Sequence, residues 1–249
     1  QNKTNMNKPD FTLDKIKFAT DGPTFEKAVA LYENGKVTQV EEGIRSYTAV
    51  VKGTKPYRVS VEARNFRYAS CSCYLGKNDT YCKHMLALAI YVVQNGKPLT
   101  VNDKKLVQNP TCSGKLGTLS DSKLLAIKET ITAALRYIKA YTGPSRTWYA
   151  YQNSLSEGCN RLSTIISDLP VSTQTAELLV DLLLRLDKKL CTGGVDDSDG
   201  AVGGFIGEVV EVLQEFAKLD PNCVNAFDKL KNRETCFGWE KPLLTATKG

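Results

Sequence analysis

The sequence predicts an α+β protein in which a small antiparallel β-sheet with a zinc-stapled ββα finger precedes an all-helical bundle or stacked helical hairpins. Three observations support this fold class. Runs of β-branched and aromatic residues alternate with polar ones between residues 37 and 63. After residue 120, apolar residues recur at the three- and four-residue spacing of amphipathic helices. Between these regions, residues 71–84 have the pattern C-x-C-x8-C-x-H, which supplies four metal ligands.

The region before the motif predicts a tail, a helix and three strands. Residues 1–20 are expected to form an N-terminal tail, because the first ten are mostly polar. Apolar residues between 25 and 32 share one face of a helix that begins behind Asp21 and stops at Gly35. Strands are expected at 37–42, 47–52 and 57–63, and the last two are joined by a turn.

The region after the motif predicts helices. Leu86, Ile90 and Val93 share one face of a helix that carries the second ligand pair on its first turn. Four apolar stripes follow within 124–138, 148–166, 179–190 and 206–216, and Asp220 and Pro221 begin a short fifth helix. The predicted domains are a tail at 1–20, a finger module at 21–98, a linker at 99–119 and a helical domain at 120–249.

Positive charge is concentrated in the first half of the chain. Residues 1–110 contain 17 Lys+Arg and 10 Asp+Glu, a net charge of +7, whereas residues 111–249 contain 16 and 17, a net charge of −1. This excess favours an anionic partner for the half with the motif, although a soluble lysine-rich face would give the same count. Five cations near the motif are candidate nucleic-acid contacts: Arg58, Arg64, Arg67, Lys77 and Lys83.

The eight cysteines are too few for a disulfide scaffold. Five of them stand outside the motif in separate segments: Cys112, Cys159, Cys191, Cys223 and Cys236. We expect these five to be buried small hydrophobic residues in a reducing compartment, and therefore a cytoplasmic protein. No apolar run approaches the roughly 20 residues that cross a bilayer, so no membrane association is expected.

The motif predicts one structural zinc ion. Cys71 and Cys73 point the same way from an extended strand end, and Cys82 and His84 face them from the start of a helix. Four protein ligands leave no coordination position for water or substrate, which is typical of structural zinc. Tyr74 and Tyr81 are expected to pack over the site. The alternative is a chance cluster of buried cysteines with a core histidine.

Catalytic motifs are not found in the sequence. Its one histidine belongs to the metal motif, so no cysteine or serine has a histidine partner. Paired carboxylates and a G-x-S-x-G motif are also missing. We therefore expect neither an enzyme nor a small-molecule substrate.

Three other segments allow two interpretations each. Residues 196–200 are an acidic turn that caps the following helix, or a weak metal or docking site. The glycines at 200–204 lack a P-loop context and are expected to let helices approach closely. Basic and aromatic residues alternate around residue 144, either as core residues or as a stacking surface for single-stranded nucleic acid. They are Arg136, Tyr137, Tyr141, Arg146, Trp148, Tyr149 and Tyr151.

The ligand pattern resembles the SWIM zinc finger, whose signature is C-x-C, a variable spacer and C-x-H, preceded by strands and followed by a helix. The resemblance covers about residues 20–96 and places the family's ligands on Cys71, Cys73, Cys82 and His84. The chain is similar to small bacterial SWIM proteins with a helical tail, which occur beside MoxR-type ATPases. The resemblance implies a module that binds protein or nucleic acid and has no reaction of its own. We expect a protein-interaction adaptor, for which the resemblance implies a MoxR-type ATPase as the partner, with DNA or RNA binding by the basic half as the alternative.

Overall fold

The computed structural model describes residues 8–145 and 148–245. The chain forms two compact units, which divide between Leu106 and Val107. This division falls inside the segment 99–119 that the sequence suggests as a linker. Each unit has a hydrophobic core of its own.

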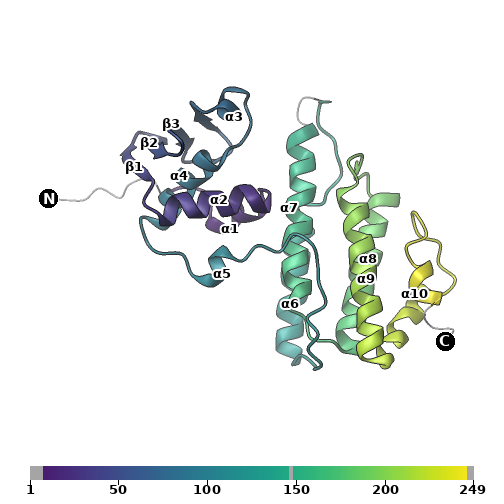
Figure 1. The fold of residues 1–249 in the computed structure, drawn as a ribbon. Coiled ribbons are helices and arrows are strands. Elements are labelled where there is room, and N and C mark those ends of the chain that lie inside the picture. Colours follow the sequence, from purple (N-terminus) through teal and green to yellow (C-terminus); the bar gives the residue numbers. More distant parts are fainter. Residues whose placement is uncertain (1–7, 146–147, 246–249) are drawn as a thin grey trace. The chain divides into compact units, whose positions relative to one another are not determined.

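The first unit contains an antiparallel sheet with the strand order β1-β2-β3-β4 (Figure 1). The strands are β1 (Val37–Glu42), β2 (Ser46–Lys52), β3 (Pro56–Glu62) and β4 (Ala69–Cys71). Tyr47 lies opposite Val61, and Ala49 opposite Val59, so one face of the sheet is apolar and buried. The other face is largely polar and exposed, as the alternating sequence predicts.

Helix α4 (Lys83–Gln94) covers the apolar face of this sheet. Its residues from His84 to Ile90 are all buried, because the sheet lies on one side of the helix and α2 (Gly22–Glu33) on the other. Helix α2 begins where expected, since the Asp21 carboxylate accepts a hydrogen bond from the backbone N–H of Thr24 (2.8 Å). Two short helices, α3 (Tyr74–Lys77) and α5 (Val101–Lys104), complete the unit after the sheet.

Part of the region expected to be a tail belongs to the core. Helix α1 (Leu13–Phe18) follows the N-cap Thr12, and the side chains of Phe11 and Ile16 are buried in the first unit. Sequence periodicity does not predict this element, because a six-residue helix makes fewer than two turns. Residues 1–7 lie outside the described part of the chain.

The second unit is helical, which confirms the predicted fold class together with the sheet of the first unit. Its elements are α6 (Asp121–Ala134), α7 (Trp148–Ser167), α8 (Thr173–Cys191), α9 (Ala201–Leu219), the 3-10 helix η2 (Pro221–Leu230) and α10 (Lys241–Thr245). The apolar stripes meet in one core that includes Leu155, Leu183 and Phe216. No helix in the described ranges is long and apolar enough to cross a membrane.

Three details of the second unit differ from the sequence-based expectation. Much of the suggested linker is attached to the helices, because Ser113 donates to the Leu169 carbonyl (2.6 Å) and the Gly117 N–H donates to the Val171 carbonyl (3.1 Å). The short fifth helix has 3-10 geometry. Gly204 does not serve close helix packing, since a Cβ atom there would meet nothing within 4 Å.

Candidate metal centre

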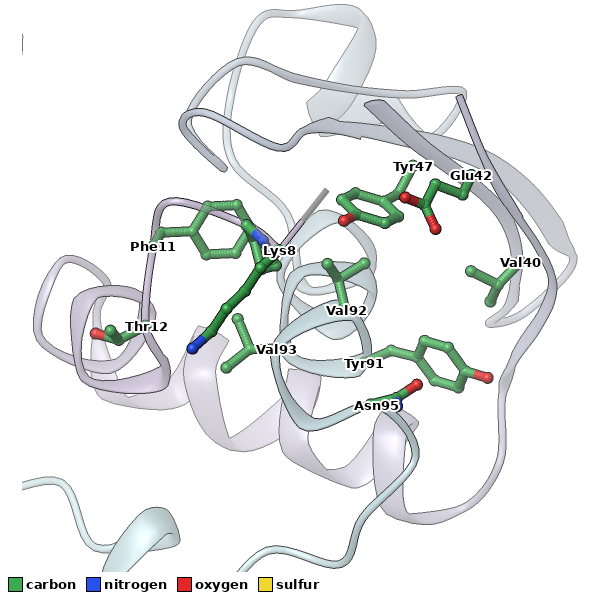
Figure 2. Close-up of a pocket in the computed structure, with 11 residues that line it drawn as sticks. Lys8, Phe11, Thr12, Val40, Glu42, Tyr47, Tyr91, Val92, Val93 and Asn95 are labelled. Atoms are coloured by element: carbon green, nitrogen blue, oxygen red, sulfur yellow. The ribbon is translucent and has the colours of Figure 1, made fainter. Parts of the chain in front are cut away.

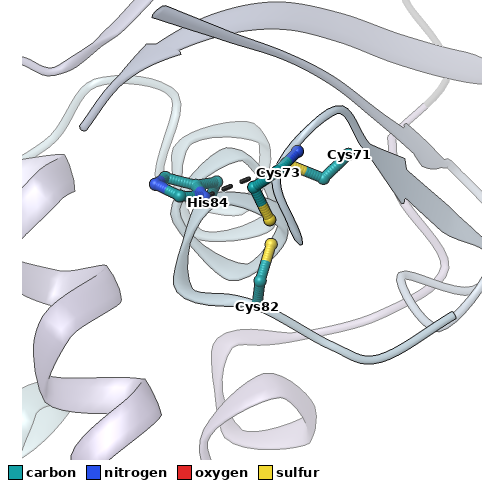
Figure 3. A group of neighbouring side chains, drawn as sticks. All are labelled: Cys71, Cys73, Cys82 and His84. Atoms are coloured by element: carbon teal, nitrogen blue, oxygen red, sulfur yellow. Dashed lines mark hydrogen bonds between the residues drawn. The ribbon is translucent and has the colours of Figure 1, made fainter. Parts of the chain in front are cut away.

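The four motif residues lie where three elements of the first unit end or begin. Cys71 is the last residue of β4, Cys73 is the N-cap of α3, and Cys82 is the N-cap of α4. His84 is the second residue of α4. All four side chains are buried and point toward one another (Figure 3).

The distances fit a tetrahedral metal site. The four ligand atoms all lie within 4.8 Å of one another, and the Cys71 Sγ and His84 Nδ1 atoms are 3.9 Å apart. Zinc–sulfur bonds of about 2.3 Å and zinc–nitrogen bonds of about 2.0 Å place ligand atoms roughly 3.5–3.8 Å apart in a tetrahedron. The Cys3His cluster can therefore hold one zinc ion after a small contraction, with Nδ1 as the histidine ligand.

The thiols are too close to ionise independently. A hydrogen bond with Cys71 lowers the pKa of the Cys82 thiol to about 4, against the opposing effect of burial. The same interaction, together with burial, raises the pKa of Cys71. A buried cluster of this kind needs a cation before all three thiols can be thiolates, which is the form that zinc requires.

The imidazole ring is held from the sheet side by residues that the motif does not include. Tyr57 on β3 packs against His84 with ring centroids 4.4 Å apart. A Cβ atom at Gly53 would lie 2.7 Å from the His84 Nε2 atom, so the β2–β3 turn approaches the ring closely. Nε2 itself is buried without a hydrogen-bond partner in the structure. The packing of α4 against β2 and β3 brings these residues to the site.

The residues expected to cover the site behave differently. Tyr74 has 81% of its surface exposed and does not cover the cluster. Tyr81 is half-buried, donates a hydrogen bond to the Arg67 carbonyl (2.8 Å) and packs against Phe66. The close contact on the loop side comes from Gly76, where a Cβ atom would lie 2.3 Å from the Cys71 carbonyl oxygen.

The five candidate nucleic-acid contacts do not form one cluster. Arg58 and Lys77 are exposed near the zinc ligands, because β3 pairs with β4 and α3 follows Cys73. Arg64 is exposed beyond the other end of β3, roughly 15–20 Å along the chain from Arg58. Arg67 and Lys83 are half-buried.

Three lysines that are not among the predicted contacts lie at the same end of the sheet as Arg58. Lys52 and Lys55 flank the β2–β3 turn, and the Lys36 carbonyl accepts a hydrogen bond from the Lys52 N–H (2.9 Å). All three side chains are exposed. Their common place could have been predicted from the hairpin turn next to Gly53, since a turn brings its two strand ends together.

The acidic turn at 196–200 is a helix cap. The Asp197 carboxylate accepts hydrogen bonds from the backbone N–H groups of Val202 (2.8 Å) and Gly203 (2.7 Å) at the start of α9. Asp196 accepts from the Trp148 indole (3.0 Å) and from Ser198. These contacts confirm the capping interpretation.

The run of basic and aromatic residues around residue 144 belongs partly to the core of the second unit. Tyr151 is buried, and its ring lies 4.6 Å from that of Tyr141. Arg161 lies over the Tyr137 ring, with 4.7 Å between the guanidinium carbon and the ring centroid. Arg146 and the side chain of Tyr149 lie outside the described part of the structure.

A pocket of about 640 Å³ lies at the other end of α4 from the zinc ligands (Figure 2). Tyr91, Val92 and Val93 of α4 form one wall, and Phe11 and Tyr47 form others. The volume and the apolar lining are typical of a cavity that accepts a small ligand or a partner's side chain. The pocket could not be predicted from the sequence, because its walls come from four separate segments.

Comparison with known proteins supports the metal centre. The SWIM zinc finger family model matches residues 57–93, which include all four ligands together with Tyr57. Comparisons with curated proteins and with solved structures give no significant match. Residues 57–93 are therefore similar to a SWIM zinc finger, and their Cys3His cluster can hold one zinc ion.

Proposed function

We propose that the protein is a non-catalytic adaptor that binds a protein partner through the surface beside its zinc site. One observation carries this proposal. Tyr74 and Leu75 are adjacent on α3, and 81% and 45% of their respective surfaces are exposed. Large apolar side chains in this position have no role in the core of the first unit.

The zinc ligands determine where these two side chains lie. Cys73 is the N-cap of α3, and its sulfur accepts a hydrogen bond from the Gly76 N–H (3.4 Å). A four-residue helix has little stability of its own, so its position depends on the metal bound by its N-cap residue. Protein interfaces are enriched in tyrosine and arginine, and exposed Arg58 lies on the strand beside β4.

The absence of catalysis is part of the proposal. His84 is the only histidine in the sequence, and it faces the three cysteine thiols. A site with four protein ligands has no open position for substrate or water. A cytoplasmic location and a MoxR-type ATPase as the partner stay predictions from the cysteine content and the family resemblance.

A binding assay with matched variants tests the adaptor. Zinc-loaded protein is immobilised and exposed to a purified MoxR-type ATPase from the native cell and to the native lysate. We expect a specific partner that is lost with Tyr74→Ala/Leu75→Ala and on zinc chelation, but is retained with Val93→Ser in the distant pocket. Partner loss only with Val93→Ser would reject the α3 surface, and capture of nucleic acid without a specific protein would reject the adaptor.

Nucleic-acid binding is the second candidate, and the lysines at the β2–β3 turn favour it. Lys36, Lys52, Lys55 and Arg58 are exposed and have no acidic partner among the residues that the structure describes. Phosphate contacts make affinity fall steeply with salt, by a slope of about 0.9 per contact for duplex DNA. Fluorescence anisotropy with DNA and RNA should show this slope and its reduction in Lys52→Gln/Lys55→Gln. Lys123→Gln/Lys128→Gln on α6 is the control, and equal loss in both variants would contradict a specific surface.

A further inference from the structure

Cys191 and Cys236 form a disulfide in the second unit, which corrects the expectation that both are isolated buried residues. Cys191 is the last residue of α8, and Cys236 lies between η2 and α10. Their Cα atoms are 5.8 Å apart, although 45 residues separate them in the sequence. This spacing lies within the usual range for disulfides.

Asp187 holds the two cysteines together by contacts that do not involve the sulfur–sulfur bond. It lies one helical turn before Cys191, and its Oδ1 atom accepts hydrogen bonds from the Cys236 N–H (2.8 Å) and the Trp239 indole (2.9 Å). Trp239 is buried and so anchors the same segment independently. If the bond is reduced, these contacts keep the thiols adjacent, so the pair is preorganised to close again.

The accessibility of this pair separates it from the other cysteines. Both residues are exposed, so a small molecule can reach either sulfur. Cys159 and Cys223 are buried, and burial raises the pKa of both thiols, that of Cys223 to about 11. Buried thiols with raised pKa values do not react readily. Three more cysteines belong to the zinc site, which leaves only half-buried Cys112 besides the pair.

We propose that Cys191 and Cys236 are a reversible thiol–disulfide modification site whose substrates are small-molecule disulfides and thiols. In the oxidising direction, the thiolate of one cysteine attacks a sulfur of the small disulfide, forms a mixed disulfide and displaces one small thiolate. The second cysteine then attacks the mixed disulfide as a thiolate and displaces the other small thiolate. The protein loses two protons and two electrons, and the small disulfide becomes two thiols. Reduction by small thiols is the reverse sequence.

Oxidation at this site ties the C-terminal segment to the end of α8. The segment carries Trp239 and Leu243, which are buried in the core of the second unit, and Glu240, whose carboxylate accepts from the Thr235 hydroxyl. A covalent link across 45 residues restricts the unfolded chain more than the folded one. The oxidised form should therefore resist local opening of this segment, whereas the reduced form depends on Asp187 and on apolar burial.

The test equilibrates the full zinc-loaded chain in buffers with different ratios of reduced to oxidised glutathione. Acid quenching, denaturation and alkylation with N-ethylmaleimide then give eight adducts on a reduced chain and two fewer on an oxidised one. We expect the wild type to convert fully in both directions at an unchanged zinc content, with a melting temperature roughly 5–15 °C higher when oxidised. Peptide mapping should find Cys191 linked to Cys236.

Variants make the assignment specific. Cys236→Ser should lose both the mass shift and the melting difference, whereas Cys112→Ser should keep them. Asp187→Ala should slow reoxidation several-fold, because the thiols lose their common anchor. Eight adducts in every buffer, or a bond that 10 mM glutathione does not reduce, would overturn the reversible site. A second zinc ion per chain that Cys236→Ser removes would replace it with a metal site formed by Asp187 and the two cysteines.

Discussion

The two units bury apolar residues in different ways. This difference indicates how strongly the stability of each unit depends on one site. The first unit wraps a small sheet and α2 around one helix, α4, whose first turn holds two zinc ligands. The second unit packs long amphipathic helices against one another around residues such as Leu183 and Phe216. Both units have a hydrophobic core, and we expect the first to depend in addition on zinc at its Cys3His cluster.

Zinc removal should have the largest effect on stability and should distinguish the two units most clearly. Structural zinc contributes an apparent binding free energy of about 10–16 kcal/mol at neutral pH, comparable to the whole stability of a domain. Chelation should therefore unfold the first unit and leave the helices of the second folded. Circular dichroism and limited proteolysis check this, and metal analysis should give one zinc ion per chain.

Cys73→Ser is the corresponding variant, and it should reproduce the effect of chelation with the zinc content lowered. Ser167→Ala in the second unit is its control, because Ser167 lies far along the chain from the ligands and its hydroxyl accepts hydrogen bonds from the N–H (3.0 Å) and the hydroxyl (3.2 Å) of Thr111. A metal-free chain with a fully folded first unit would contradict the proposed dependence.

Core truncation should lower stability by about 2–5 kcal/mol in either unit, since a leucine-to-alanine change leaves a cavity. Leu183→Ala in α8 and Leu88→Ala in α4 are matched, because both side chains are fully buried. Leu183→Ala should lower only the midpoint temperature of the melting transition that persists after chelation. Leu88→Ala should lower only the midpoint temperature of the zinc-dependent transition. A single shared transition in both variants would show that the units unfold together.

The longer helices, the first three strands and the zinc ligands could be predicted from local pattern, whereas the short helix α1 and the support of the zinc site could not. Strand positions followed from alternation, helix positions from apolar spacing, and the ligand set from a fourteen-residue window. Gly53 and Tyr57 reach His84 through the packing of α4 against β2 and β3. Cys191 and Cys236 meet only after two helices and η2 have packed. Contacts between distant segments depend on the packed structure, which periodicity does not encode.

Gly76→Ala should weaken zinc binding by roughly 10–100-fold, as changes next to metal ligands commonly do. Its added Cβ would lie 2.3 Å from the Cys71 carbonyl oxygen, so the backbone that carries this ligand must move. Competition with a chromophoric chelator measures the affinity. Gly204→Ala in α9 is the control, since its Cβ meets nothing within 4 Å and alanine favours a helix by up to about 1 kcal/mol. It should leave zinc affinity unchanged and raise the stability of the second unit.

The smallest effect concerns the start of α9. Asp197→Ala should lower the stability of the second unit by about 1 kcal/mol, because it removes a carboxylate that accepts two backbone N–H groups at the helix N-terminus. Asp199→Ala is the matched control, since its closest such contact is a long one with the Ala201 N–H (3.5 Å). Urea denaturation of the chelated protein isolates the second unit and measures both changes. Equal losses would mean that the turn acts through its total charge, whereas a loss confined to Asp197→Ala assigns the stabilisation to the cap. Because the helical unit spreads its stability over many contacts, even this loss should leave it folded, unlike the loss of one ligand in the zinc finger.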